Sequence, residues 1–335
     1  MTSRPSAAVA ERRDTGSVVS ATMTGTEPEA SQLSPLQHKT LGLLRRAPDP
    51  IVFDTAFVAS LRTDVEETFA GFHERLGDTS IFLSKHRVTS VLGCEVQHLQ
   101  VDDFSWSRAV AGGQVAHRAV QLLINWRGDP VPSDVVDEAI ARLADDDSSL
   151  GDWIESLGDA DLADLRGFSV DKLIKFQECF PPLDRRAAPT VESSVRWPVD
   201  GPIVLSGKVD LTLGRPAGAE SRKVIIDLKT GWASPKHRED LRFYALVETL
   251  RSQIPPRKLA SFYLDAGEPV VEDVTERTLL TASRRMLDAA NAEIELTVEG
   301  RPPVKRPGTS CRWCPLSDDC AEGRAYLDGD DDERP

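Results

Sequence analysis

The chain has 335 residues, of which 40% are hydrophobic, enough for a large domain with a buried core. No apolar run reaches the roughly 18 residues that a membrane-spanning helix needs, and the first residues lack the apolar stretch of a secretion signal, so we expect a cytoplasmic protein with no membrane partner. The net charge of −14 is concentrated in residues 132–165, with eleven acidic residues and one basic residue, and in residues 328–335, with five and one. The remainder is balanced, so the acidic total does not exclude binding to nucleic acid.

The first part of the chain is predicted to be a disordered tail followed by helices. Residues 1–33 are rich in Ser, Thr, Ala, Glu and Pro, a composition typical of disorder. A short helix is expected from Ser34-Pro35, an N-cap and first-turn pair, and a second helix over about 56–76. Residues 84–94 and 113–126 are also predicted to be helical, the latter with apolar residues on most sides.

The acidic residues 132–165 are predicted to be helical, and we expect an acidic helical insertion over about 130–180 to lie on the surface. Mimicry of DNA, or contact with a basic partner, is the less favoured interpretation of this face. Residues 326–335 are predicted to be an acidic disordered tail.

From about residue 190 the pattern changes to the alternation of strands. Residues 191–197, 202–213 and 223–228 are predicted strands, the last two joined as a hairpin by the loop 214–220. A helix over 238–252, a strand over 259–264 and a long helix over 277–298 follow. This order predicts an α/β fold in which helices flank a central sheet.

Two aspartates interrupt apolar strands and mark a candidate catalytic site. Asp210 lies in Gly207-Lys-Val-Asp210-Leu, and Asp227 lies in Ile225-Ile-Asp227-Leu-Lys229. Because a carboxylate buried without a partner is costly, two neighbouring strands that each carry one indicate a shared cation such as Mg²⁺. Asp227 and Lys229 point to the same face of a strand, which brings the ammonium group near the metal. An ordinary surface salt bridge on a hairpin is the alternative interpretation.

A histidine on the Gly-rich helix is a candidate third ligand. His117 follows Gly112-Gly-Gln-Val-Ala and shares its helix face with Val120 and Ile124. Such a histidine is more often a core residue, but beside an acidic metal site its neutral ring nitrogen can serve as a ligand.

The motifs stand in a fixed order along the chain: a first cysteine (Cys94), a Gly-rich helix with histidine (His117), a Gly-x-x-Asp strand (Asp210), an Asp-x-Lys strand (Asp227 and Lys229), a helix with tyrosine (Tyr244) and a three-cysteine tail (Cys311, Cys314 and Cys320). In this order they resemble the PD-(D/E)XK nuclease superfamily over about residues 80–325. More narrowly, they resemble the RecB-type and CRISPR-associated exonucleases that carry an iron–sulfur cluster. The resemblance implies a restriction-endonuclease-like core with a mixed sheet, within a nuclease domain of residues 34–325.

The resemblance also implies the chemistry of the site. His117, Asp210 and Asp227 would bind Mg²⁺ or Mn²⁺, and Asp210, Asp227 and Lys229 would be catalytic. The family's glutamine-and-tyrosine helix is matched at Tyr244, but Asp240 stands where glutamine is usual, and Glu192 resembles an acidic position one strand earlier. These last three are accessory candidates. The expected activity is that of a DNA exonuclease in repair, recombination or end processing.

The cysteines form a split set. Cys311, Cys314 and Cys320 lie close together, whereas 216 residues separate Cys94 from Cys311. Three cysteines within ten residues favour metal ligation in a reducing compartment over disulfides. Four thiolates can hold a [4Fe–4S] cluster or zinc, and the spacing does not decide between them; the resemblance favours the cluster, which would join the N- and C-terminal parts of the domain. Cys179 has no partner in the pattern and is expected to be a core thiol.

The expected partner is DNA, single-stranded in one interpretation, with a helicase or repair complex as a further partner. An iron–sulfur DNA-binding or scaffold subunit with a weak or idle nuclease site is the alternative. Zinc in place of the cluster is a third interpretation. Residues that could contact phosphates or stack on bases, though each is more often an ordinary surface or core residue, are Arg118, Arg127, Lys208, Arg242, Arg312, Trp106, Trp126 and Trp313.

Overall fold

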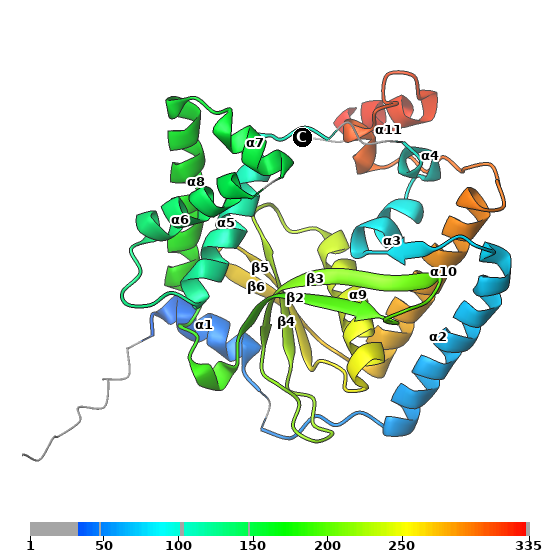
Figure 1. Ribbon diagram of the computed structural model, residues 1–335, viewed down its shortest axis with the longest axis horizontal. Coiled ribbons are helices and arrows are strands. Elements are labelled where there is room, and N and C mark those ends of the chain that lie inside the picture. Colours follow the sequence, from blue (N-terminus) through cyan, green and yellow to red (C-terminus); the bar gives the residue numbers. More distant parts are fainter. Residues whose placement is uncertain (1–32, 47, 101–103, 147, 333–335) are drawn as a thin grey trace, which may run out of the picture. The chain divides into compact units, whose positions relative to one another are not determined.

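The computed structural model describes residues 33–46, 48–100, 104–146 and 148–332 (Figure 1). The disordered tail expected over residues 1–33 lies, apart from Leu33, outside the described residues. No described helix is both long and apolar enough to cross a membrane.

A six-stranded mixed sheet forms the centre of the domain (Figure 1). Its strands are β1 (Ile81–Leu83), β2 (Thr190–Trp197), β3 (Ile203–Leu213), β4 (Val224–Lys229), β5 (Lys258–Tyr263) and β6 (Glu268–Asp273). They run in the order β1-β3-β4-β5-β6, with β2 paired to β3 outside this path. β1–β3 and β4–β5 are parallel, whereas β2–β3, β3–β4 and β5–β6 are antiparallel. The mixed central sheet of the α/β prediction is therefore present.

The hairpin of β3 and β4 and the strands β2 and β5 lie where the sequence predicts strands. β1 and β6 were not predicted. β1 has only three residues, and β6 contains Pro269 and three acidic residues, which are unfavourable in strands. β6 tolerates the proline because it lies at the edge of the sheet.

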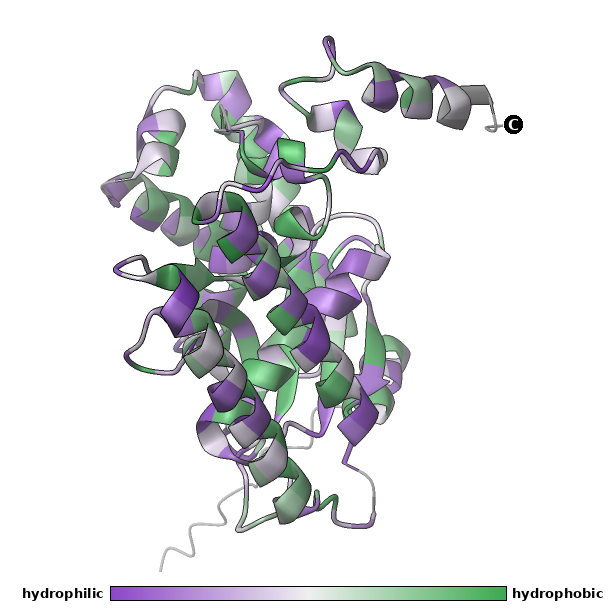
Figure 2. Ribbon diagram, turned by 90° about the vertical axis from the view of Figure 1, so that its right-hand side faces the viewer, coloured by the Kyte–Doolittle hydropathy of each residue, from purple (hydrophilic) through white to green (hydrophobic). Residues whose placement is uncertain are grey.

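Helices cover both faces of the sheet. They are α1 (Pro35–Leu44), α2 (Thr55–Leu76), α3 (Lys85–Val91), α4 (Glu95–His98), α5 (Arg108–Ile124), α6 (Pro132–Asp145), α7 (Ser149–Glu155), α8 (Asp159–Cys179), α9 (Pro235–Ser252), α10 (Glu276–Thr297) and α11 (Ala321–Asp332), with the 3₁₀ turns η1 (Arg185–Ala187) and η2 (Thr309–Trp313). Consecutive residues of β4 point to different layers: Ile225 packs with α2, α3, α9 and α10, and Ile226 packs with α5, α6 and α8. On the side of α2 and α10, hydrophilic and hydrophobic residues alternate along the helices, as amphipathic helices require (Figure 2).

The acidic segment is helical, but it is not a mere surface insertion. Val135, Val136 and Leu165 of α6 and α8 are fully buried in the core that they share with α5. The acidic residues take the outer side, where Asp137, for example, pairs with Arg166. The high count of acidic residues in the sequence hid a narrow apolar stripe, which is enough to dock both helices.

The C-terminal residues form a helix over most of the stretch that was predicted to be a disordered tail. Residues 326–332, predicted to be disordered, continue helix α11, which starts at Ala321. The run Arg324-Ala-Tyr-Leu contains good helix formers, and these carry the helix into the acidic stretch. Residues 333–335 of the predicted tail lie outside the described residues.

Candidate active site

The two aspartates lie opposite each other on paired strands. Leu211 of β3 pairs with Ile226 of β4, and continuing this antiparallel register places Asp210 opposite Asp227. Beyond the Leu211–Ile226 pair, a side chain replaces the backbone as hydrogen-bond acceptor between the two strands. Asp210 Oδ2 accepts a hydrogen bond of 2.7 Å from the Leu228 N–H. The site therefore begins where the β3–β4 ladder ends.

Asp227 is buried between two lysines. Its side chain is only 3% exposed; Lys229 Nζ lies 2.6 Å from Oδ2, and Lys85 Nζ donates to Oδ1 at 2.8 Å. Burial alone would raise the pKa of Asp227, but the charges of Lys85 and Lys229 outweigh it and hold the pKa below its ordinary value. Asp227 is thus an ionised carboxylate. The contact with Lys229 follows from the pleat of β4, as the spacing predicts.

His117 reaches the same place from α5. Its Nδ1 lies 3.6 Å from Asp210 Oδ1. One turn earlier, a Cβ on Gly113 would lie 2.9 Å from Thr230 Oγ1, so the glycine allows α5 to approach the end of β4 closely. The Gly-rich start of the helix therefore has a steric reason, which is to bring His117 beside Asp210.

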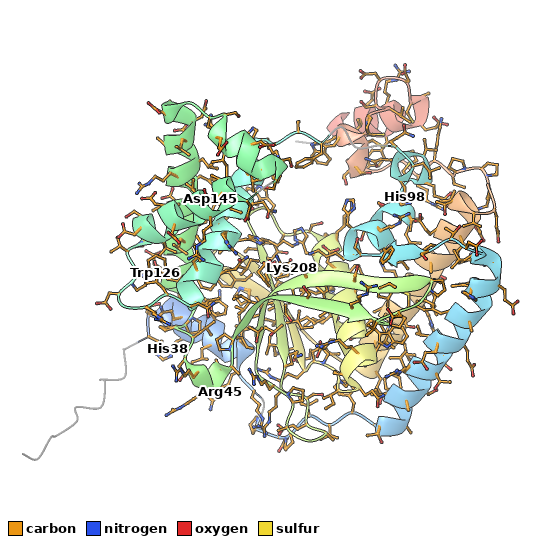
Figure 3. The ribbon with its side chains drawn as sticks, viewed as in Figure 1. His38, Arg45, His98, Trp126, Asp145 and Lys208 are labelled. Carbon is orange, nitrogen blue, oxygen red and sulfur yellow. The ribbon has the colours of Figure 1, made fainter. Side chains whose placement is uncertain are left out.

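Glu192 joins the site from β2 through a strained backbone. The register of β2 and β3 pairs Val191 with Leu211 and Ser193 with Val209, which puts Glu192 beside Asp210. Its φ of 52° is left-handed, a conformation that costs a non-glycine residue about 1–3 kcal/mol. Glu192 forms an ion pair with Lys208, which lies on β3 in Figure 3, and accepts a hydrogen bond of 2.6 Å from Gln121.

Asp240 and Tyr244 lie on α9 and differ in their contacts. Asp240 Oδ2 is 3.8 Å from Lys229 Nζ and 4.0 Å from Lys85 Nζ. Its pKa is raised by burial, which the two lysines only partly offset. Tyr244 is buried and donates to the Lys208 carbonyl at 2.8 Å. Tyr244 therefore fixes β3, whereas Asp240 lies beside the two lysines that contact Asp227.

A pocket of about 430 Å³ collects the predicted residues. It is lined by Lys85, Gln114, His117, Arg118, Gln121, Leu143, Asp146, Glu192, Lys208, Asp210, Asp227, Leu228 and Lys229. Asp227 Oδ2 accepts no well-directed hydrogen bond from the described residues, despite its ion pair with Lys229. The carboxylates of Asp210 and Asp227 and the imidazole of His117 are ligand types that suit a divalent cation such as Mg²⁺ or Mn²⁺. As they stand, no three His, Cys, Asp or Glu side chains in the described part of the chain are close enough to ligate one ion.

Lys85 is the functional candidate that our sequence analysis missed. It is the first residue of α3, after the N-cap Ser84, and His86 and Arg87 follow it. The positive charges of Lys85 and Arg87 in the first turn oppose the helix dipole, which favours negative charge there. That conflict was the available signal, because such a cluster needs acidic partners from elsewhere in the fold.

The four cysteines of the split set lie around one pocket of about 110 Å³. Cys94, Cys311, Cys314 and Cys320 all line it. Backbone N–H groups point at two sulfurs, from Gly308 to Cys311 Sγ at 3.4 Å and from Gly323 to Cys320 Sγ at 3.3 Å. A Cβ on Gly323 would lie 3.4 Å from both of these sulfurs. All five cysteines are free, and Cys179 is buried in α8.

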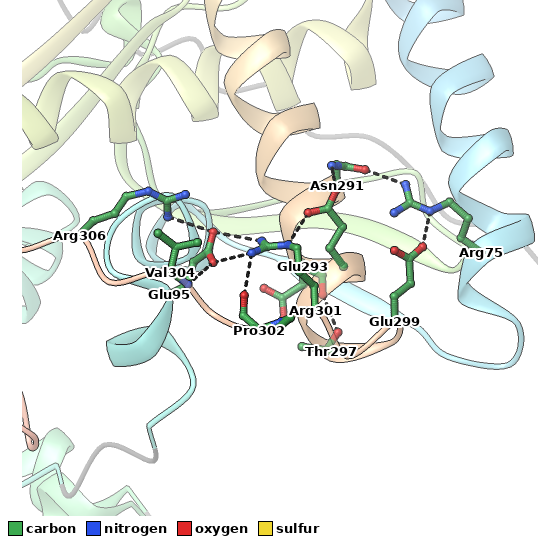
Figure 4. A network of polar contacts seen from close by, with 11 residues as sticks. Arg75, Glu95, Asn291, Glu293, Thr297, Glu299, Arg301, Pro302, Val304 and Arg306 are labelled. Atoms are coloured by element: carbon green, nitrogen blue, oxygen red, sulfur yellow. Dashed lines mark hydrogen bonds and ion pairs between the residues drawn. The ribbon is translucent and has the colours of Figure 1, made fainter.

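A buried glutamate next to Cys94 in the sequence binds the C-terminal segment through Arg301, Val304 and Arg306 (Figure 4). Glu95 is 2% exposed; its oxygens accept hydrogen bonds from Arg301 at 3.0 and 3.1 Å, from Arg306 at 3.0 Å and from the Val304 N–H at 2.7 Å. The hydrogen bonds from Arg301 hold the pKa of Glu95 at about 2 against the opposing effect of burial, with help from the Val304 N–H and Arg306. This contact explains how residues so distant in sequence share one pocket.

The aromatic candidates divide by exposure. Trp106 and Trp126 are half-buried against the core of α5 and α8, whereas Trp313 is 76% exposed. Trp232, which was not among the candidates, is 96% exposed and follows Lys229 by three residues.

A model of the PD-(D/E)XK nuclease superfamily matches residues 83–321. The chain belongs to this superfamily, whose members typically hydrolyse phosphodiester bonds with Mg²⁺ or Mn²⁺. Curated proteins give no significant match. Among solved structures, the crystal structure of SSO0001 is similar over 79% of this chain and 97% of that chain, at 13% identity with a TM-score of 0.31.

Proposed function

We propose that the chain is a metal-dependent DNA exonuclease of the RecB type. The observation that carries this proposal is the pocket in which Asp210, Asp227, Lys229 and His117 meet at the end of the β3–β4 ladder. The strain at Glu192 supports it, because backbone strain is concentrated at functional sites.

In this proposal Asp210, Asp227 and His117 hold the cation. The bound cation would lower the pKa of a water molecule and neutralise charge that develops on the phosphate. Lys229, fixed 2.6 Å from Asp227, orients the attacking water or the scissile phosphate. Arg118 lines the same pocket, and its buried Nε has no hydrogen-bond partner in the described residues, so it suits a phosphate oxygen.

The test is cleavage by the variants Asp227→Asn and Lys229→Met, with Asp273→Asn as the control. We expect both site variants to lose at least about a hundredfold in rate, as removal of a preorganised catalytic group commonly does. Asp273 is 71% exposed on β6 and pairs only with Lys258 among the described residues, so its variant should cleave normally. Wild-type rates in either site variant would refute the assignment.

Exonuclease action is tested with matched linear and circular DNA, single- and double-stranded, and with RNA of the same sequence. We expect linear single-stranded DNA to be degraded from its ends and circles to survive. The exposed Trp232 and Trp313 are suited to stacking on unpaired bases. Cleavage of circles would show an endonuclease. If the protein binds DNA but cleaves none at any metal concentration, the alternative function is favoured. The chain would then be a DNA-binding or scaffold subunit of a helicase or repair complex, with an idle nuclease site.

We also propose that Cys94, Cys311, Cys314 and Cys320 bind a [4Fe–4S] cluster. Their common pocket and the N–H groups directed at two sulfurs support this, since such hydrogen bonds accompany thiolate ligands. Anaerobically purified protein should contain iron and sulfide, and Cys94→Ala should lose both. Cys179→Ala is the matched control and should keep them. A colourless protein with one zinc per chain would establish the zinc alternative.

A further inference from the structure

The site contains one more lysine than its motifs account for, and the extra charge is balanced. Lys85 and Lys229 both contact Asp227, at 2.8 and 2.6 Å. Both also face Asp240 Oδ2, at 4.0 and 3.8 Å. The four groups therefore form a compact cluster of two positive and two negative charges.

The position of Lys85 is set by more than ion pairs. Its Nζ lies 5.1 Å from the centre of the Tyr244 ring, within the range of a cation–π contact. Its side chain is 27% exposed, and burial would lower its pKa, but Asp227, Tyr244 and Asp240 together raise that pKa above the ordinary value. Lys85 is thus a charged, fixed group and not a mobile surface lysine.

Lys85 and Lys229 also stand where two pockets meet. One is the pocket of the aspartates; the other, also of about 430 Å³, is lined on the far side by His86, Lys236 and His237, among others. Both lysines line both pockets. A nucleic-acid strand that extends from one pocket into the other must pass them.

Within the proposed nuclease function, on which this inference rests, we propose that Lys85 is a second active-site lysine. Asp227 and the Tyr244 ring hold Lys85 in place, Asp240 balances its charge, and Lys85 binds the phosphate next to the one that is cleaved. Asp240 and Lys85 are then a charge-balanced pair, because the negative charge of Asp240 offsets the positive charge that Lys85 adds beside the metal site.

The pairing predicts an order of metal affinities that needs no cleavage to observe. The wild-type cluster is neutral, Lys85→Met leaves it at −1, Asp240→Asn leaves it at +1, and the double variant is neutral again. Mn²⁺ binding, measured by calorimetry without DNA, should be about fivefold tighter in Lys85→Met and about fivefold weaker in Asp240→Asn, as expected for a divalent ion near one added or removed charge. The double variant should bind Mn²⁺ as the wild type does.

Lys236→Met is the matched control, because it removes a lysine from the neighbouring pocket that has no ion pair with Asp227 or Asp240 among the described residues. Its Mn²⁺ affinity should stay within twofold of the wild type. Weaker Mn²⁺ binding in Lys85→Met, or tighter binding in Asp240→Asn, would overturn the pairing. Thermal unfolding of each variant shows whether it is folded, and Lys85→Arg, which keeps the charge, should retain the wild-type Mn²⁺ affinity.

Cleavage at saturating Mn²⁺ tests the phosphate contact separately. The double variant should cleave at least about tenfold more slowly than the wild type, although its metal affinity is restored. Cleavage at the wild-type rate would remove Lys85 from the substrate site. If the wild type neither binds Mn²⁺ nor cleaves, the proposed function fails and this inference with it. If the wild type does both and only the order of the variants is wrong, the inference alone fails.

Discussion

Replacing Glu95 by Gln should lower the free energy of unfolding by about 3 kcal/mol. Glu95 is buried, and its pKa falls from 4.5 to about 2 through Arg301, the Val304 N–H and Arg306, a change equivalent to about 3 kcal/mol. Removal of one partner from a buried ion pair commonly costs about 3–5 kcal/mol, which agrees. In Glu95→Gln, Arg306 would lose its ion pair and Arg301 would keep only its pair with Glu295, so the segment that leads to Cys311 would be released.

Urea unfolding measures the loss, and limited proteolysis after residue 301 measures the release. Glu299→Gln is the control, because Glu299 belongs to the same surroundings but is 42% exposed in its pair with Arg75 (Figure 4). We expect at most about 1 kcal/mol from that exposed pair. Suppose that the free energy of unfolding of Glu95→Gln stays within about 0.5 kcal/mol of the wild-type value and that the chain after residue 301 resists protease. The hydrogen bonds of Glu95 then do not hold this segment in place.

The pKa of Glu293, raised by burial but lowered further by hydrogen bonds from His98 and Arg87, lies at about 2. Because the pKa values of Glu95 and Glu293 are lower in the folded chain than in the unfolded chain, the stability that the two carboxylates contribute is complete above about pH 5. This stability is lost as the pH falls toward 2. Unfolding midpoints measured at pH 7, 5, 4 and 3 should show the loss, and Glu95→Gln should show a smaller loss than the wild type. Gly207→Ala should cost about 1–3 kcal/mol, because the new Cβ would lie 2.5 Å from Tyr244 Cε1, whereas Gly71→Ala in α2, with nothing within 4 Å, should be neutral or stabilising in the same thermal assay. Tyr244→Phe should cost about 1 kcal/mol in urea through the lost hydrogen bond to Lys208, and an unchanged unfolding midpoint would contradict its role in fixing β3.

The strands of the candidate site could be read from the sequence because local pattern determines them. Alternation in β2 and the apolar runs of β3 and β4 are properties of short segments, and the Asp227–Lys229 contact follows from the two-residue repeat of a strand. β1 was not recognised, because its three residues become a strand only by pairing with Ile203–Leu205, more than a hundred residues away.

The partners of the site residues were harder to predict than the residues themselves. Lys85 contacts Asp227 and Asp240 only after α3, β4 and α9 have packed, and no spacing rule links these three segments. The acidic helices were misjudged for a related reason: the overall count of charges conceals a stripe of a few apolar residues such as Val136 and Leu165. The strain at Glu192 is likewise a property of the assembled sheet.

The long connection between Cys94 and its neighbours in space has a consequence for biosynthesis. Ribosomes add about 5–20 residues per second, so Cys94 and Glu95 leave the ribosome roughly 10–40 s before Arg301, Arg306 and Cys311. Packing of the core that contains Val65 and Leu83 is also delayed, because Leu279 and Ile294 of α10 complete this core. The nascent chain must therefore keep an apolar surface and the free thiol of Cys94 unassembled until α10 and the later cysteines are synthesised, and any metal at the four cysteines is acquired at the end of folding.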